Sequence, residues 1–127
     1  MTFKRVILEC GTGNDLYGRD YTKAACRAVQ DALHHSSLSL FNTLDLDRDA
    51  MRVVVNIGVQ QPDAVDVERV AAQIPFGDVT VDTRLGGLDV PDTTRPAADD
   101  GTSERTVIAT AGVAAYIDLP DERFVIR

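Results

Sequence analysis

Four charged side chains lie close enough together in the sequence to share one site. Glu9 and Asp15 are carboxylates that could act as a general base, and Lys23 and Arg19 are cations that could hold an anionic substrate. A carboxylate beside a lysine can have a shifted pKa, as catalytic groups often do. We therefore take Glu9, Asp15 and Lys23 as catalytic candidates and Arg19 as a ligand-binding candidate.

Glycines surround these charges, and glycine lets a backbone take a positive φ or approach another group closely. The remaining ligand-binding candidates are Gly11, Gly13, Gly18, Asp20, Gly86 and Gly87. A glycine-rich turn before a helix can bind an anion through its free N–H groups and the helix dipole. The spacing matches neither the dinucleotide pattern G-x-G-x-x-G nor the P-loop ending G-K-[ST], and the nearby carboxylates would repel an anion. A tight structural turn and a ligand site are both open interpretations.

Other chemistries have less support in the sequence. No Ser or Cys lies in a recognisable Ser-His-Asp or Cys-His setting, and no H-x-x-x-H or C-x-x-C pattern indicates a metal site. We expect no metal and no cofactor. His34 and His35 close a helix, where histidine interacts favourably with the dipole, and Cys10 and Cys26 are expected to be small buried residues.

Strand and helix signals alternate along the chain. Strands are expected at 3–8, 51–59, 78–84 and 105–117, and helices at 21–35 and 66–73, with Asp20 and Asp66 as their N-caps. The order β-α-β-α-β-β predicts an α/β protein of two layers with a mixed four-stranded sheet. Helical crossovers imply parallel neighbours, and the loop between the last two strands implies an antiparallel pair. A ferredoxin-like sandwich, the second choice, would need the order β-α-β-β-α-β.

The stretch that holds the candidate residues also resembles a known family. The family pattern is met by Glu9, Gly11, Gly13, Asp15, Gly18, Asp20, Thr22, Lys23, Ala24 and Ala25, with later matches at 74–77 (I-P-F-G) and 86–88 (G-G-L). The chain resembles the Lin-zero-five-twelve family of uncharacterised conserved hypothetical proteins over most of its length, apart from about 91–104. Tyr17 stands where relatives often have histidine, so histidine chemistry is not carried over to that position. The resemblance supplies a family and implies no known activity.

The element order is similar to that of the Bacillus-type chorismate mutase fold, which reactive-intermediate deaminases share. That resemblance implies a sheet face that is exposed in a monomer and buried in a trimer, with ligand clefts between subunits. The alternating strand at 78–84 and the long apolar strand at 105–117 offer more sheet surface than two short helices can cover. We therefore expect a homo-oligomer, with a trimer favoured.

Composition limits the partners and the setting. The chain has 127 residues, which predicts a single domain over 1–127, and its Pro- and Asp-containing stretch near 91–104 is expected to be a mobile loop. A net charge of −7 argues against binding to nucleic acid or to an anionic membrane. The excess of 16 Asp over 4 Glu, and of 11 Arg over 2 Lys, favours a salt-adapted source over a GC-rich genome alone. No secretion signal or long apolar span is evident, so we expect a cytoplasmic protein.

Two functions of different classes follow from these features. The first is an enzyme that acts on a small anionic or carbonyl-bearing metabolite in a cleft at a subunit interface. The alternative is a non-catalytic protein that binds a metabolite or assembles into an oligomer. Fold analogy cannot separate the two, because one fold hosts many functions.

Overall fold

A computed structural model describes residues 2–16, 19–34, 50–91 and 105–119 of the chain. In these residues the elements are β1 (Thr2–Asp15), α1 (Tyr21–His34), β2 (Arg52–Val59), the 3-10 helix η2 (Pro62–Ala64), α3 (Val67–Ala71), β3 (Asp78–Leu85), β4 (Leu88–Pro91) and β5 (Arg105–Leu119). Most of the loop that was expected to be mobile, and Gly18 and Tyr17, lie outside the described residues. No described helix has the length and apolar character needed to cross a membrane.

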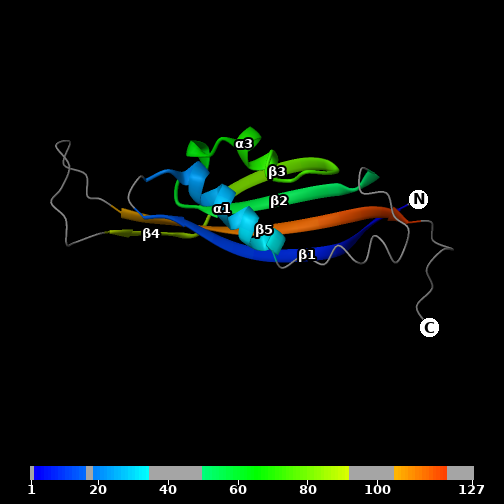
Figure 1. Ribbon diagram of the computed structural model, residues 1–127, viewed down its shortest axis with the longest axis horizontal. Helices are drawn as coiled ribbons and strands as arrows, with labels where there is room; N and C mark the ends of the chain where they lie inside the picture. Colours follow the sequence, from blue (N-terminus) through cyan, green and yellow to red (C-terminus); the bar gives the residue numbers. More distant parts are fainter. Residues whose placement is uncertain (1, 17–18, 35–49, 92–104, 120–127) are drawn as a thin grey trace.

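One mixed, open sheet of five strands organises the molecule (Figure 1). Its strands follow the order β1-β5-β2-β3, and β4 pairs with β5 beyond the end of β2. The α/β class and the parallel pairing of β2 with β3 are as predicted. The four-stranded sheet is wrong because β4 was missed. The expected parallel pair of β1 with β2 and the expected antiparallel pair of β3 with β5 are also wrong, because β5 lies between β1 and β2, antiparallel to both. The likeness to chorismate mutase stays a prediction.

The glycine stretch after the first apolar residues is strand, not turn. β1 continues through it to Asp15, and Cys10 to Gly13 pair in register with Gly112 to Ala109 of β5. Neither Gly11 nor Gly13 has a positive φ. The expected turn at this place is therefore wrong, and these glycines must have another structural role.

That role is the close approach of α1 to β1. A Cβ on Gly11 would collide with the backbone of Ala28 and Ala32, and a Cβ on Gly13 would collide with the backbone of Ala24, Arg27 and Ala28. The stripe of α1 that faces the sheet is mostly alanine and fully buried, at Ala24, Ala25, Ala28, Val29 and Ala32. Small residues on both elements let the helix lie directly on the strand, as Figure 1 shows.

The polar side of α1 protects the free edge of β1. Asp31 Oδ2 accepts a hydrogen bond from the Thr12 backbone N–H at 3.0 Å, and Arg27 Nη1 donates to the Asn14 carbonyl at 2.7 Å. An edge strand with unpaired backbone groups invites pairing with another chain. The helix therefore covers the sheet on one face and also satisfies part of its outer edge.

The second helix packs on the same face as α1. Asp66 caps α3 as predicted, accepting from the backbone N–H groups of Glu68 and Arg69. Val70 of α3 is fully buried in the core, and Cys26 of α1 donates a weak hydrogen bond to the Arg69 carbonyl. In the described part of the chain, no helix lies on the opposite face of the sheet, which we call the open face.

Candidate functional site

An ionic cluster forms where β1 ends and α1 begins, at the place that the sequence singled out. The Asp15 carboxylate is buried, accepts the Asp20 backbone N–H at 3.0 Å and lies 3.5 Å from Lys23 Nζ. Asp20 caps α1 as predicted, because its Oδ1 accepts the Lys23 backbone N–H at 3.0 Å. The structure therefore brings Asp15, Asp20 and Lys23 together.

Tyr21, the first residue of α1, links this cluster to two residues from distant parts of the chain. The Tyr21 hydroxyl donates to Asp89 Oδ2 on β4, and Arg105 Nη1 of β5 lies 3.1 Å from the same oxygen. In the sheet, Val107 pairs with Asp15 on one side and with Asp89 on the other, so the two carboxylates lie on the same face. Sequence analysis missed Asp89 because the short β4 strand was not predicted.

The electrostatics of the cluster favour fixed protonation states. Burial raises the pKa of Tyr21 above its ordinary value, and the hydrogen bond to Asp89 raises it further. The hydrogen bond to Asp89 likewise raises the pKa of Arg105. A tyrosine with a raised pKa stays protonated at neutral pH and acts as a hydrogen-bond donor rather than as a base. The second oxygen of Asp89, Oδ1, is buried without a hydrogen-bond partner.

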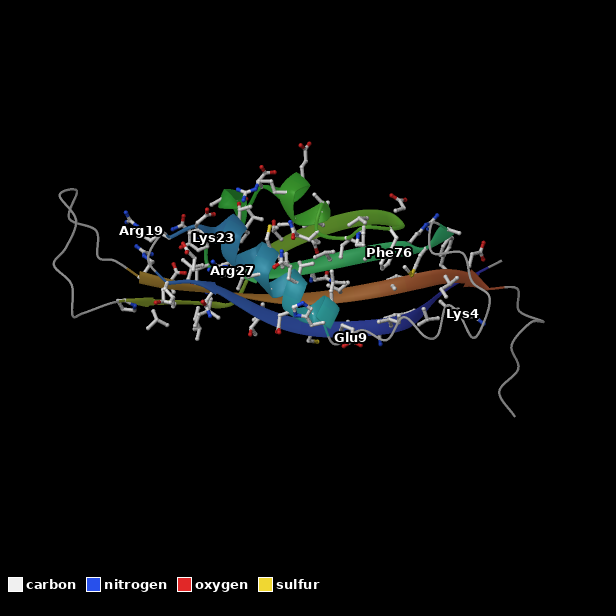
Figure 2. All side chains as sticks on the ribbon, viewed as in Figure 1. Lys4, Glu9, Arg19, Lys23, Arg27 and Phe76 are labelled. Atoms are coloured by element: carbon white, nitrogen blue, oxygen red, sulfur yellow. The ribbon has the colours of Figure 1, made fainter. Side chains whose placement is uncertain are left out.

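Two predicted site residues take different places relative to this cluster. Glu9 lies six residues before Asp15 on an extended strand, about 20 Å away at the usual rise per residue. Figure 2 shows Glu9 near the end of α1, while Lys23 and Arg19 lie near its start. Arg19 precedes the helix with a φ of 52°, an uncommon left-handed conformation for a residue with a side chain. Arg19 can therefore share a site with Lys23, whereas Glu9 is not brought beside it.

Gly86 and Gly87 allow the chain to pass from β3 to β4. β3 pairs with the edge of β2 that faces away from β5, whereas β4 pairs with β5 beyond the end of β2. The segment between β3 and β4 must therefore pass close to Gly58 of β2. Gly87 has a φ of 60°, and a Cβ on it would collide with the Ile108 carbonyl. Gln60 Nε2 donates to the carbonyls of both glycines, at 3.0 and 3.3 Å. These glycines are explained by the crossing itself.

A second candidate site is a hollow of about 560 Å³, most of whose lining residues belong to the open face. Two neighbouring rows of the sheet form its floor, one across Cys10, Gly112 and Asn56 and the other across Thr12, Thr110, Gly58 and Arg84. Each row has a glycine at its centre. A Cβ on Gly112 would meet nothing within 4 Å, so the floor is open above that residue.

The hollow offers neutral polar groups, one carboxylate (Asp31) and one cation (Arg84). Cys10 is exposed there, which corrects the expectation that it is buried, whereas Cys26 is buried as expected. Asn56 Nδ2 donates to the Gly112 carbonyl at 3.3 Å, and Thr12 and Thr110 supply hydroxyl groups. The Arg84 side chain is 74% exposed at the rim, with its Nε 2.7 Å from Asp82. These groups can hydrogen-bond a small polar ligand, with Arg84 for a negative charge.

No group of three or more metal-binding side chains occurs in the described residues. Together the fold and these two sites define a small α/β protein with a mixed open sheet, one face of which is covered by helices.

The chain belongs to the Lin0512 family of conserved hypothetical proteins, whose model matches residues 5–115. It is similar to the crystal structure of an FtsZ-like protein of unknown function from Nostoc punctiforme. The two are 33% identical, with a TM-score of 0.80, over 94% of this chain and 99% of that chain. No curated protein matches the chain.

Proposed function

We propose that this protein binds a small metabolite with an anionic or carbonyl group in the hollow on the open face of its sheet. The observation that carries the proposal is the opening above Gly112. Glycine inside a long strand costs about 0.5–1 kcal/mol relative to alanine, and no neighbour in the described chain explains it here. Such a glycine marks a place where a ligand or another backbone comes close.

The lining of the hollow supports binding more than catalysis. Ligand sites combine a concave surface with a few placed polar groups, as the hydroxyls, amide and thiol do here. Arg84 is the proposed contact for the anionic or carbonyl group, because a guanidinium can hold a carboxylate or phosphate with two parallel hydrogen bonds. The proposed assembly is a homo-oligomer, with a trimer favoured, in a salt-rich cytoplasm.

The test combines recovery of a natural ligand with a thermal-shift screen. Denatured, purified protein is filtered and the filtrate analysed by mass spectrometry, and the intact protein is screened against small carboxylates and sugar phosphates. A compound that raises the melting temperature should bind Arg84→Gln at least about tenfold more weakly, since a charge-assisted hydrogen bond contributes about 1.5–3 kcal/mol.

Arg5→Gln is the matched control, because Arg5 is an exposed arginine that does not line the hollow. It should bind the same compound as tightly as the wild-type protein does. The proposal fails if no compound is recovered and none in the screen raises the melting temperature, or if the two variants behave alike.

The ionic cluster at the start of α1 supports a second candidate function, an enzyme with Lys23 as its charged contact. Lys23 is 49% exposed beside a buried Asp15, and one oxygen of Asp89 is buried without a hydrogen-bond partner. Here Asp15 would be the general base, with Arg19 nearby; the proposed role of Glu9 would need a separate site. A ligand whose binding is lost in Lys23→Met and kept in Arg84→Gln would favour this candidate.

A further inference from the structure

The open face carries a continuous strip without charged side chains, which we call the neutral strip. Its members lie on β1, β5, β2 and β4, namely Leu8, Cys10, Thr12, Asn14, Thr106, Ile108, Thr110, Gly112, Ala114, Val54, Asn56, Gly58, Leu88 and Val90. All of them except Ala114 are exposed or half-exposed in the single chain. In this acidic chain, 26% of the residues are charged. A set of water-facing positions as large as the strip would ordinarily include several of those charges.

Charges reappear around the strip rather than within it. Asp78, Asp82 and Arg84 lie along β3 at one edge of the face, and Arg5 and Arg52 lie at one end. Arg52 is stacked on the ring of Phe3, 3.8 Å from its centroid. An uncharged centre with a polar and charged rim is the usual anatomy of a protein–protein interface.

We infer that the neutral strip is the surface on which a second copy of this chain packs. This inference rests on the proposed function and deepens it, because the second copy would close the hollow over the bound ligand. A like partner needs a contact surface without charge, because two chains of net charge −7 repel each other and the neutral strip lets them meet without opposing carboxylates.

The strip is close in size to the smallest specific contacts between two proteins. The strip spans 8–14 on β1, 106–114 on β5, and 54–58 with 88–90 on β2 and β4. At about 3.4 Å per residue and about 4.8 Å between strands, it presents roughly 400 Å² of projected sheet surface per copy. Two copies then cover about 800 Å² of projected surface before side-chain relief is added, against about 1,000 Å² for the smallest specific interfaces. The exposed side chains of Leu8, Leu88 and Val90 supply the apolar part of the contact.

The two native cysteines allow a direct test in the full chain. Cys10 lies within the neutral strip and is exposed in the single chain, whereas Cys26 is buried in the core. We expect sedimentation to give an oligomer mass, and Cys10 to react with a thiol reagent about tenfold more slowly in the assembled protein than after dilution to the monomer. Cys26 should stay unreactive throughout.

Gly112→Arg places a charge at the centre of the strip, where the single chain has room for a side chain. The variant should sediment as a folded monomer with an unchanged circular dichroism spectrum and a reactive Cys10. Thr80→Arg is the matched control, because Thr80 is exposed between the acids of β3 at the rim, and it should keep the oligomer mass.

Each alternative occupant predicts a different result, and each overturns the inference. A monomer mass with a reactive Cys10 means that the face is free, and a monomer mass with a protected Cys10 means that another segment or a small molecule covers it. An oligomer with a reactive Cys10 means that the copies meet elsewhere. Ligand binding by a monomer would overturn this inference alone, while an oligomer that binds no ligand would overturn the proposed function alone.

Discussion

The ammonium of Lys23 lies 3.5 Å from the buried carboxylate of Asp15, so the lysine that the sequence marked as a ligand contact has a partner in its own chain. Lys23 is half-exposed and Asp15 also accepts the Asp20 backbone N–H, which places this pair between a surface and a buried salt bridge. The distinction between a structural and a functional lysine can therefore be tested by mutation.

Lys23→Met should lower the free energy of unfolding by about 1–2 kcal/mol, more than an exposed ion pair contributes and less than a fully buried one. Chemical denaturation measures this change, with Lys4→Met as the control at the only other lysine. Unchanged stability together with lost ligand binding would contradict a structural role and support the second candidate function.

Gly13→Ala should destabilise the fold by about 3 kcal/mol or more, because the new methyl group would collide with the backbone of α1 and force the helix away from β1. Gly112→Ala should leave stability unchanged or raise it by about 0.5–1 kcal/mol, since that site is open and alanine loses less entropy on folding. Denaturant titration of both variants compares the two glycines. Equal effects would show that α1 does not pack on Gly13 as described.

Alkaline pH should weaken the fold through Tyr21. Its pKa is raised in the folded chain, by burial first and by Asp89 second, so the unfolded chain loses this proton at a lower pH than the folded one. The resulting stability is fully present below pH 10, the ordinary tyrosine pKa, and is lost as the pH rises through the folded value.

Unfolding curves across this alkaline range measure the effect. Tyr21→Phe should be less stable at neutral pH and should show a shallower alkaline loss, while Tyr116→Phe on the open face should keep the slope of the wild-type protein. If Tyr21→Phe and the wild-type protein lose stability in parallel, the Tyr21–Asp89 hydrogen bond is not the cause.

Added salt should stabilise the protein if its aspartate excess is an adaptation to salt. The net charge of −7 opposes compaction, and ions screen this repulsion. We expect the melting temperature to rise between dilute buffer and molar potassium chloride, as read by differential scanning fluorimetry. A flat or falling melting temperature would argue against a salt-adapted source.

Several elements follow from local sequence signals. The apolar spacing and the Asp20 cap predicted α1 to within one residue at its end, and Asp66 predicted the start of α3. The alternation of β2 predicted its buried side, and the helical crossover between β2 and β3 predicted their parallel pairing. These features depend on residues near one another in the chain, so a single sequence carries them.

The remaining features depend on contacts between residues far apart in the chain. A glycine is compatible with either a turn or a close contact, so the sequence alone could not distinguish the two. The position of α1 over Gly11 and Gly13 shows that both glycines serve a close contact. The insertion of β5 between β1 and β2 is likewise a choice of strand partners that no local signal contains. That insertion aligns Cys10, Gly112 and Asn56 in one row of the open face. The sequence thus determined the helices, the strand types and the ionic groups, whereas tertiary pairing created the hollow and joined Tyr21 to Asp89.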